Sequence, residues 1–238
     1  MSQLKVIEVK GLSKSYGKTK ALQGLNLEIE EGEFFGFLGP NGAGKTTTIK
    51  LLTGQMEQDN GDAKVLGIDT RNAIEVKRVI GIVPEIVFLP SFLTVEEYLE
   101  FVCGIRKTKK ENIEFWLDFT ELREATDTLC KDLSLGMKQK LSFASAFIHE
   151  PKLVFLDEPF ADVDPLMQNK IKGFLKEYMG KGGTIFLSTH ILEIAEKLCS
   201  RIAIINRGAL VRTGTMAELL GEGKDLEEVF LNMVRKDG

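Results

Sequence analysis

The stretch Gly39-Pro-Asn-Gly-Ala-Gly-Lys-Thr46, followed by Thr47, decides the fold of this chain. Its glycines let successive backbone N–H groups curve around an anion without interference from Cβ atoms. The apolar run Glu33-Phe-Phe-Gly-Phe-Leu38 predicts a buried strand entering this loop, and a helix is expected to begin near Lys45 with its positive end toward the anion. Lys45 can reach the β- and γ-phosphates of a nucleotide, and the Thr46 hydroxyl can hold Mg²⁺. The pattern predicts a nucleoside triphosphate site; a glycine-rich turn with a chance lysine is the alternative.

Composition narrows the class of protein. The chain has 238 residues, of which 43% are apolar and 28% charged, as is typical of an ordinary soluble globular protein. The net charge of −4 argues against a general nucleic-acid binder, and no apolar run approaches the roughly 20 residues that a membrane span needs. The 3 cysteines are far apart in the sequence and fit a reducing cytosol rather than a zinc site or a disulfide framework.

Short apolar runs alternate with amphipathic stretches, which is typical of an α/β protein. Three separated runs are expected to form a small antiparallel layer: Leu4–Val9, Leu25–Ile29 and Val65–Ile68. Five mostly apolar runs are expected to be strands of a parallel main sheet, buried on both faces: Phe34–Leu38, Ile80–Val83, Leu153–Asp157, Thr184–Ser188 and Ile202–Asn206. A turn then leads into a last strand, Leu210–Thr213.

The middle of the chain has helical rather than strand periodicity. Thr94-Val-Glu-Glu97 is a capping box, and further helices are expected over Lys110–Phe119 and from Ser134 to about His149. We expect one domain over 1–238, with a core of about 1–85 and 151–220 and a helical subdomain of about 86–150. A short amphipathic helix of about 225–236 should pack on the core, and a dimer contact is the alternative for it.

Two acids follow the predicted strand in Leu153-Val-Phe-Leu-Asp-Glu158. They lie at its carboxyl end, where ligands bind in open α/β sheets. Asp157 is placed to hold Mg²⁺, and Glu158 is placed to deprotonate a water that attacks the γ-phosphate. An acidic turn without chemistry is the weaker interpretation.

A second anion site is predicted at Leu133-Ser-Leu-Gly-Met-Lys-Gln139. Ser134 is a good N-cap, and the helix that follows it has no acidic residue in its first turn. Simple helix capping is the alternative. The motif precedes Asp157 and Glu158 by about 20 residues, a spacing that makes it more specific.

These motifs, in this order, give the chain a resemblance to the ATP-binding subunits of ABC transporters, from about Leu4 to Leu220. The segment Gly39–Thr47 resembles their Walker A motif, Ser134–Gln139 their signature and Leu153–Glu158 their Walker B motif. Further matches are the D-loop Ala161-Asp-Val-Asp164, the switch histidine His190 and the aromatic Tyr16, which stacks on adenine in the family. Tyr16 alone could equally be an ordinary loop aromatic, and His149, the other histidine, fits a helix cap.

The resemblance implies a P-loop NTPase fold, with a RecA-like parallel-sheet core, an N-terminal antiparallel β layer and an inserted helical subdomain. It also implies ATP hydrolysis with Mg²⁺. The residues implied for catalysis are Glu158, His190 and Lys45, and those for the metal are Thr46, Glu85 and Asp157. The residues implied for ATP binding are Tyr16, Gly39, Pro40, Asn41, Gly42, Ala43, Gly44, Lys45, Thr46 and Thr47. Those implied to bind the ATP of a partner chain are Ser134, Leu135, Gly136 and Met137, with Asp164 of the D-loop at the dimer seam.

The sequence departs from the family pattern at two places. Glu85 stands where the family usually has a glutamine that contacts Mg²⁺; a carboxylate can bind Mg²⁺ at least as well, but it adds a negative charge beside Asp157 and Glu158. The signature has Leu135 and Met137 around Gly136 in place of the usual glycine and glutamine. This form resembles that of subunits serving exporters, so we expect export.

The resemblance further implies a head-to-tail dimer, formed with a second copy or a homologous ATPase subunit, that encloses two ATP molecules. Separate integral membrane subunits should dock near Glu85–Pro90 and the helical insertion, which would place the chain at the cytoplasmic face of the membrane. No nucleic acid is expected. The alternatives are a soluble ABC ATPase in a non-transport process, a binding module that uses ATP as a switch, and a small-molecule kinase, which would leave the signature unexplained.

Overall fold

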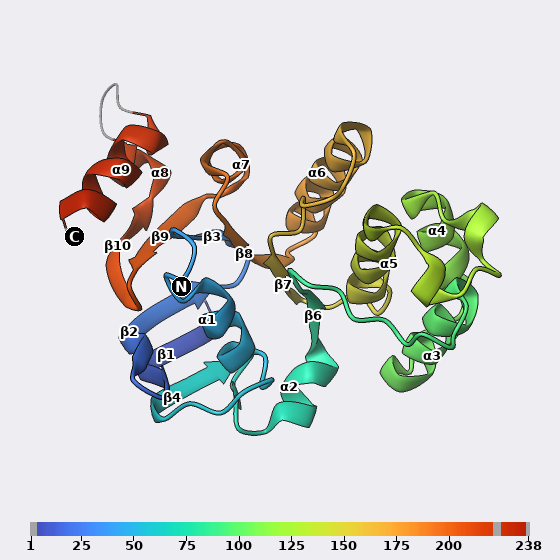
Figure 1. The fold of residues 1–238 in the computed structure, drawn as a ribbon, viewed down its shortest axis with the longest axis horizontal. Helices are drawn as coiled ribbons and strands as arrows, with labels where there is room; N and C mark the ends of the chain where they lie inside the picture. The colour runs from blue at the N-terminus through green and yellow to red at the C-terminus, as the bar shows by residue number, and fades with distance from the viewer. Residues whose placement is uncertain (1–3, 221–224, 237–238) are drawn as a thin grey trace.

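The main sheet of the computed structural model, which describes residues 4–220 and 225–236, has six strands in the order β10-β9-β3-β8-β7-β6 (Figure 1). The five from β9 to β6 run parallel, and β10 closes the edge antiparallel to β9. Their bounds are β3 Phe34–Leu38, β6 Ile80–Val83, β7 Leu153–Asp157, β8 Thr184–Thr189, β9 Arg201–Asn206 and β10 Ala209–Thr215. The predicted parallel core is therefore confirmed.

The five parallel strands of the main sheet are mostly apolar and buried on both faces. One core cluster contains Phe35, Phe155 and Phe186, and the other contains the alternate residues Leu156 and Ile185. Successive side chains of a strand point to opposite faces, so each strand contributes to both clusters. This double burial fixes the register of the strands that carry the site.

The N-terminal antiparallel layer is a second sheet in the order β2-β1-β4-β5, at the lower left of Figure 1. It is built from β1 Lys5–Tyr16, β2 Thr19–Glu30, β4 Asn60–Val65 and β5 Ile68–Asp69. The layer is confirmed, but the single strand predicted over Val65–Ile68 is wrong. Leu66 and Gly67 have φ values of 49° and 78° and form the turn between β4 and β5.

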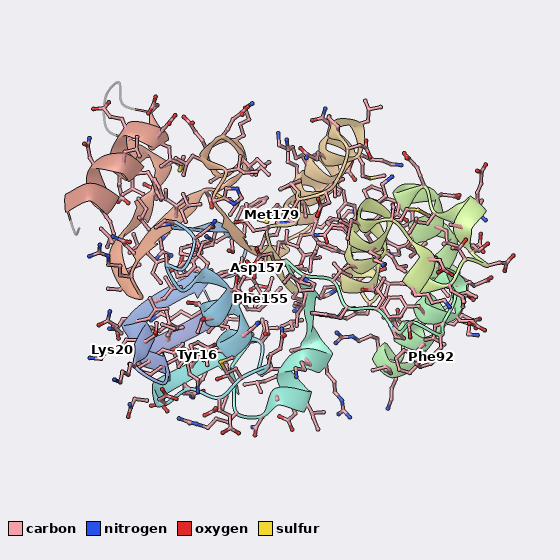
Figure 2. All side chains as sticks on the ribbon, viewed as in Figure 1. Tyr16, Lys20, Phe92, Phe155, Asp157 and Met179 are labelled. Atoms are coloured by element: carbon pink, nitrogen blue, oxygen red, sulfur yellow. The ribbon has the colours of Figure 1, made fainter. Side chains whose placement is uncertain are left out.

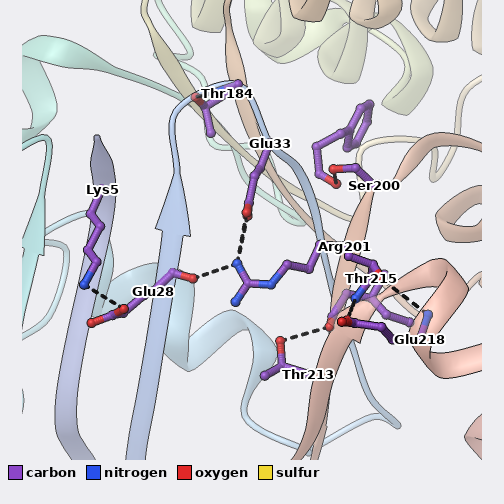
Figure 3. A network of polar contacts seen from close by, with 12 residues as sticks. Lys5, Glu28, Glu33, Thr184, Ser200, Arg201, Thr213, Thr215 and Glu218 are labelled. Carbon is purple, nitrogen blue, oxygen red and sulfur yellow. Dashed lines mark hydrogen bonds and ion pairs between the residues drawn. The ribbon is translucent and has the colours of Figure 1, made fainter. Parts of the chain in front are cut away.

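The two sheets are joined by a polar network around Arg201 at the start of β9 (Figure 3). Its guanidinium donates to the Glu28 carbonyl oxygen at 3.0 Å and to the Glu33 carboxylate at 3.0 Å, and it lies 5.4 Å from the centre of the Phe35 ring. Burial raises the pKa of the Glu33 carboxyl, and Arg201 opposes that shift. Lys5 pairs with the Glu28 side chain at 2.8 Å within the antiparallel layer, whereas the bond from Arg201 to the Glu28 carbonyl oxygen connects that layer to β9.

Helices α3, α4 and α5 form a group beyond strand β6, at the right of Figure 1. They span Val95–Arg106, Glu111–Thr120 and Leu135–Phe147, with two short 3₁₀ turns at Arg123–Ala125 and Cys130–Asp132. The capping box is present: the Glu97 amide donates to the Thr94 hydroxyl, and the Glu97 carboxylate accepts from the Thr94 amide. An aromatic cluster centred on Trp116 packs the group onto helix α6.

His149 follows α5 but does not cap it, contrary to our interpretation. Its Nε2 lies 3.2 Å from the Ile80 carbonyl oxygen at the start of β6, and its Nδ1 is buried without a hydrogen-bond partner among the described residues. Burial, together with the nearby Arg106 charge, lowers the pKa of His149 to about 4. His149 therefore joins the helical group to the sheet as a neutral imidazole.

The remaining helices cover the sheets. They are α1 Lys45–Leu52, α2 Ala73–Val79, α6 Pro165–Gly180, α7 Leu192–Leu198, α8 Met216–Leu220 and α9 Leu226–Lys236. In α9, Leu226 and Val229 are buried, and the helix contacts α7 and α8. The predicted packing of the C-terminal helix on the core is therefore confirmed for its described residues. The two ends of the domain expected over 1–238 lie outside the described residues.

Candidate active site

The carboxyl ends of β3, β7 and β8 meet at one cavity of about 740 Å³, next to the start of α1. Figure 2 shows Asp157 near the centre of the molecule, between the antiparallel layer and helix α6. The cavity is lined by predicted site residues from four separate segments: Asn41, Gly42, Gly44, Lys45, Thr46, Thr47, Glu85, Asp157, Glu158 and His190. The structure thus brings these four segments to a single place, as expected for ligand sites in open α/β sheets.

The phosphate-binding loop is shaped by close backbone contacts that only glycine permits. A Cβ on Gly39 would lie 2.5 Å from the Ile205 carbonyl oxygen, and one on Gly44, whose φ is 110°, would lie 2.6 Å from the Ala21 carbonyl oxygen. The Lys45 ammonium is mostly buried and donates to the Gly39 carbonyl oxygen at 2.8 Å. The hydrogen bond to this loop carbonyl oxygen holds Lys45 at the start of the helix. There the Lys45 ammonium can replace this partner by a phosphate oxygen.

The buried carboxylate of Asp157 leaves one oxygen without a partner. Its Oδ1 accepts no hydrogen bond from the described residues, and the residue is 3% exposed. Burial, with the neighbouring charges of Glu85 and Glu158, raises the pKa of the Asp157 carboxyl. Beside it, the Thr46 hydroxyl donates to the Glu85 carboxylate at 3.3 Å. An orphaned buried carboxylate oxygen next to a hydroxyl and a second carboxylate fits a hard divalent cation.

Within the described ranges, no three histidine, cysteine, aspartate or glutamate side chains form a ready-made metal cluster. Mg²⁺ has few protein ligands in many phosphate-transfer sites. There the ion is bound by one or two protein oxygens, water and the phosphates of the substrate, rather than by a cage of protein ligands.

Glu158 is held by two side chains from the end of β8. Its Oε1 lies 2.8 Å from His190 Nδ1, and its Oε2 accepts from the Thr189 hydroxyl at 3.0 Å. The Glu158 backbone has a φ of 48°, an uncommon conformation for a residue other than glycine. Thr189 is not among the residues predicted from the sequence. The sequence could have indicated Thr189, because it lies between Ser188 and His190 at the carboxyl end of a strand that leads to the site.

Tyr16 does not belong to the lining of this cavity. Its side chain is 47% exposed, and its hydroxyl donates to the Met56 sulfur at 3.0 Å. Figure 2 shows Tyr16 and Lys20 over the antiparallel layer. The lining on this side instead includes residues that the sequence did not single out: Lys18, Thr19, Lys20, Ala21, Gln23 and Arg207. Adenine stacking on Tyr16 stays a prediction.

The signature segment lies outside the cavity that surrounds the phosphate-binding loop of its own chain. Ser134 caps α5 by accepting from the Met137 amide at 3.2 Å, as predicted, and Leu135 is 68% exposed. A Cβ on Gly136 would lie 2.7 Å from the Asp162 carbonyl oxygen, so this glycine allows α5 to approach the D-loop closely. No residue of 134–137 lines the cavity.

Asp164 orders the D-loop and begins helix α6. Its Oδ1 accepts from the Met167 amide at 3.0 Å, and Lys140 of α5 lies 3.7 Å from its Oδ2. The bond from the Met167 amide lowers the pKa of the Asp164 carboxyl. Asp164 therefore orders the loop, and its place at a dimer seam stays a prediction.

The family model described as "ABC transporter" matches residues 22–161, which is more than half of the chain. This chain belongs to the ABC transporter family. It is an ATP-binding cassette, and its predicted class as an ATPase is confirmed by that membership. No helix within the described residues is both long enough and apolar enough to cross a membrane.

Relatives of this ABC protein include several with export or resistance in their names. It is 34% identical to the linearmycin resistance ATP-binding protein LnrL of Bacillus subtilis over 90% of its own length and 70% of that protein. It is 37% identical to the Nod factor export ATP-binding protein I of Rhizobium meliloti, over 91% of this chain and 66% of that one. With the probable multidrug ABC transporter ATP-binding protein YbhF of Escherichia coli the identity is 33%, and the chain spans only 42% of that relative.

Solved structures of ATP-binding cassettes share the fold over nearly the whole chain. An ATP-binding subunit of an ABC transporter superposes with a TM-score of 0.90 at 31% identity, covering 96% of this chain and 99% of the other. A dimeric, post-hydrolysis state of a cassette bound to ADP and Pi superposes with a TM-score of 0.82 at 25% identity, covering 88% and 98%. The predicted fold class is therefore confirmed.

Proposed function

We propose that this ABC protein is the ATP-hydrolysing motor subunit of a transporter. Two chains, arranged head to tail, bind MgATP between them. Hydrolysis drives a conformational change in separate membrane subunits, in the direction of export. The observation that carries the proposal is the group at the ends of β7 and β8. A buried carboxylate with a free oxygen, Asp157, lies next to a carboxylate, Glu158, that is held by His190 and Thr189. Phosphoryl transfer needs these two parts, one for the metal and one for the water.

We propose the following roles for the chain's own side chains in hydrolysis. Lys45 leaves the Gly39 carbonyl oxygen and binds phosphate oxygens, assisted by the N-terminus of α1. Glu158 accepts the proton of the attacking water, while the hydrogen bond between its Oε1 and the His190 ring keeps the carboxylate aimed at the cavity. The Glu158 carboxylate is already held by His190 and Thr189 before the substrate binds, which limits the reorganisation that the reaction requires.

Mg²⁺ would be held by Thr46 and Asp157, with Glu85 as a further ligand or a partner of a bound water. When bound, the ion neutralises charge that develops on the phosphate oxygens. The Thr46–Glu85 hydrogen bond supports a role for Glu85 at this site, although the family usually has glutamine there. We propose that Glu85 keeps the metal-sensing role with a changed Mg²⁺ affinity.

Self-association is supported by the surface around the signature. Leu135 and Leu166 are large apolar side chains that are 68% and 82% exposed, and they flank the contact between Gly136 and the D-loop. An ATP molecule held by two helix N-termini, one from each chain, is stabilised only when both chains meet. The dimeric cassette with ADP and Pi shows that a protein of this fold assembles as a dimer.

The surface for the membrane subunits is proposed on the segment that follows Glu85 and on helix α3. It presents large apolar side chains to solvent: Ile86, Phe88, Phe92, Phe101 and Ile105, with Phe88 87% exposed. Figure 2 shows Phe92 beside the helical group. An exposed apolar group of this size is typical of a protein interface, and it begins one residue after Glu85 of the active site. We further propose that the sheets form a core unit and 86–150 a helical subdomain that moves with the partner, at the cytoplasmic face of the membrane.

Phosphate release is the direct test of hydrolysis. The purified chain should release phosphate from ATP in the presence of Mg²⁺, and it should do so more slowly per chain as it is diluted, because the complete site needs two chains. A chain that binds ATP and never releases phosphate would be a switch module instead.

Co-purification from membranes is the test of the transport role. Affinity-tagged protein should bring down an integral membrane protein, and Phe88→Asp should remove that partner without changing ATP binding. Export is supported by the form of the signature and by the names of the relatives. Recovery of only ribosomal or other non-membrane partners would favour the alternative, a soluble ABC ATPase outside transport.

A further inference from the structure

A second cavity, of about 690 Å³, lies at the amino ends of the parallel strands, whereas the phosphate-binding loop lies at their carboxyl ends. Its lining includes Lys152 and Gly183, which precede strands β7 and β8, whereas the active-site residues follow the same strands. A strand of about five residues is roughly 17 Å long. The two cavities lie at opposite ends of the strands, so about this length separates them. The volume is within the range of small-molecule sites.

One wall of this cavity is aromatic and is held in place by its packing. Helix α4 contributes Phe115 and Trp116, and helix α6 contributes Phe174 and Tyr178. The Trp116 and Phe174 rings meet edge to face at 5.2 Å, and the Tyr178 hydroxyl donates to the Pro151 carbonyl oxygen at 2.7 Å. These contacts hold the wall in place, and the Trp116–Phe174 contact joins helix α4 to helix α6.

The lining of the cavity carries more acids than bases. Four carboxylates line it, from four different segments: Glu31, Glu111, Glu150 and Glu177. Within residues 4–220 and 225–236, none of the four forms an ion pair, and the only cations in the lining are Lys152 and Lys181. Carboxylates that are unpaired and outnumber the ammonium groups around an apolar space attract a cation.

We propose that this cavity binds an organic cation with an aromatic or aliphatic body, such as a quaternary ammonium or phosphonium ion. The aromatic wall removes the apolar body from water and contributes cation–π attraction. The four carboxylates compensate the charge without requiring the cation to be fully buried. A neutral apolar compound would gain only the first of these contributions, and an anion would be repelled.

An occupant would touch the helical group through Phe115 and the core through Tyr178 at the same time. It would therefore oppose any movement of α4 relative to α6, in a place that no nucleotide-binding residue lines. The proposal does not depend on the proposed function, because binding at this cavity requires neither ATP nor a partner subunit.

The test uses Trp116, the single tryptophan of the chain, which lines the cavity. Full-length protein without nucleotide is titrated with tetraphenylphosphonium and, separately, with tetraphenylborate, which has a similar shape and the opposite charge. We expect a saturable change of tryptophan fluorescence with the cation and none with the anion. No saturable change, or equal affinity for both ions, would overturn the proposal.

Paired variants separate the cavity from general surface effects. The double change Glu111→Gln and Glu177→Gln should weaken cation binding by about tenfold. The control double change Glu124→Gln and Glu196→Gln removes two exposed carboxylates outside the cavity and should leave binding unchanged. Equal weakening in both double variants would mean that only net charge attracts the probe, and it would refute the site.

A last comparison checks the aromatic wall and the separation from the active site. Phe115→Ala should lower the affinity for tetraphenylphosphonium, whereas Ile105→Ala, an exposed apolar position on α3 outside the cavity, should not. Saturating MgATP should not displace the cation. Displacement by MgATP in competition would assign the probe to the nucleotide site and would overturn the proposal.

Discussion

Replacing Glu158 by glutamine should separate hydrolysis from nucleotide binding. Glutamine keeps an oxygen that can accept from Thr189 at 3.0 Å, and its backbone φ of 48° costs no more than that of glutamate. The variant therefore folds and binds ATP, but its amide cannot accept a proton from water. The loss of a general base lowers turnover by roughly 10²–10⁴-fold, which raises the barrier by about 2.7 to 5.4 kcal/mol.

The assay is phosphate release at saturating MgATP, with ATP affinity measured in parallel by equilibrium titration. Thr189→Val is the matched positioning variant, because it keeps the side-chain shape and removes the hydroxyl that donates to Glu158. We expect it to lower turnover by about tenfold, the order of one lost hydrogen bond to a charged group, with ATP affinity unchanged. Turnover of the Glu158→Gln variant within tenfold of the unmodified chain would refute the assignment of Glu158 as the base.

Three further predictions concern the loop, the metal and pH. Lys45→Ala should weaken ATP binding by at least tenfold in an equilibrium titration, because it removes the cation that lies at the start of α1; unchanged affinity would contradict the assignment of the loop. Glu85→Gln should shift the Mg²⁺ concentration at half-maximal phosphate release by roughly tenfold, the order expected for one charge near the ion; superimposable Mg²⁺ curves would remove Glu85 from the metal site. His149 has a pKa of about 4 in the folded chain against an ordinary value of 6.5, so its contribution to stability is complete above pH 6.5 and declines as the pH falls toward 4. Through this group the free energy of unfolding, measured in urea, should fall by about 1 to 2 kcal/mol between pH 7 and pH 5. The His149→Gln variant should show a flatter dependence of this free energy on pH over the same range. Equal pH dependence in the two proteins would disprove the contribution of His149.

The parallel strands were predictable because burial on both faces leaves a continuous apolar run in the sequence. The run Phe34–Leu38 coincides with β3, and Ile80–Val83 with β6. The hairpin between β4 and β5 was missed for the opposite reason. Leu66 adopts a positive φ that favours glycine or asparagine, so its identity predicts a strand rather than a turn.

The candidate site was predictable where its residues form contiguous motifs and unpredictable where tertiary packing alone brings them in. Lys45 and Asp157 belong to motifs whose spacing implies phosphate chemistry. Lys20 and Arg207 line the same cavity from the hairpin between β1 and β2 and the turn between β9 and β10, and no local pattern distinguishes them from ordinary surface cations. The pairing of His149 with the carbonyl of Ile80, 69 positions away, is likewise a product of packing.

The geometry at the end of β7 explains how two adjacent acids can take different roles in one cavity. Successive side chains of a strand point to opposite faces, so Asp157 and Glu158 would diverge if the strand simply continued. The positive φ of Glu158 breaks that alternation, and both residues line the same cavity. Asp157 stays buried with an oxygen free for a cation, whereas Glu158 is occupied by Thr189 and His190. One backbone angle therefore lets the acid that we propose to bind the metal and the acid that we propose to accept the proton line one cavity, and a β-branched residue at position 158 should lose both the carboxylate and this turn.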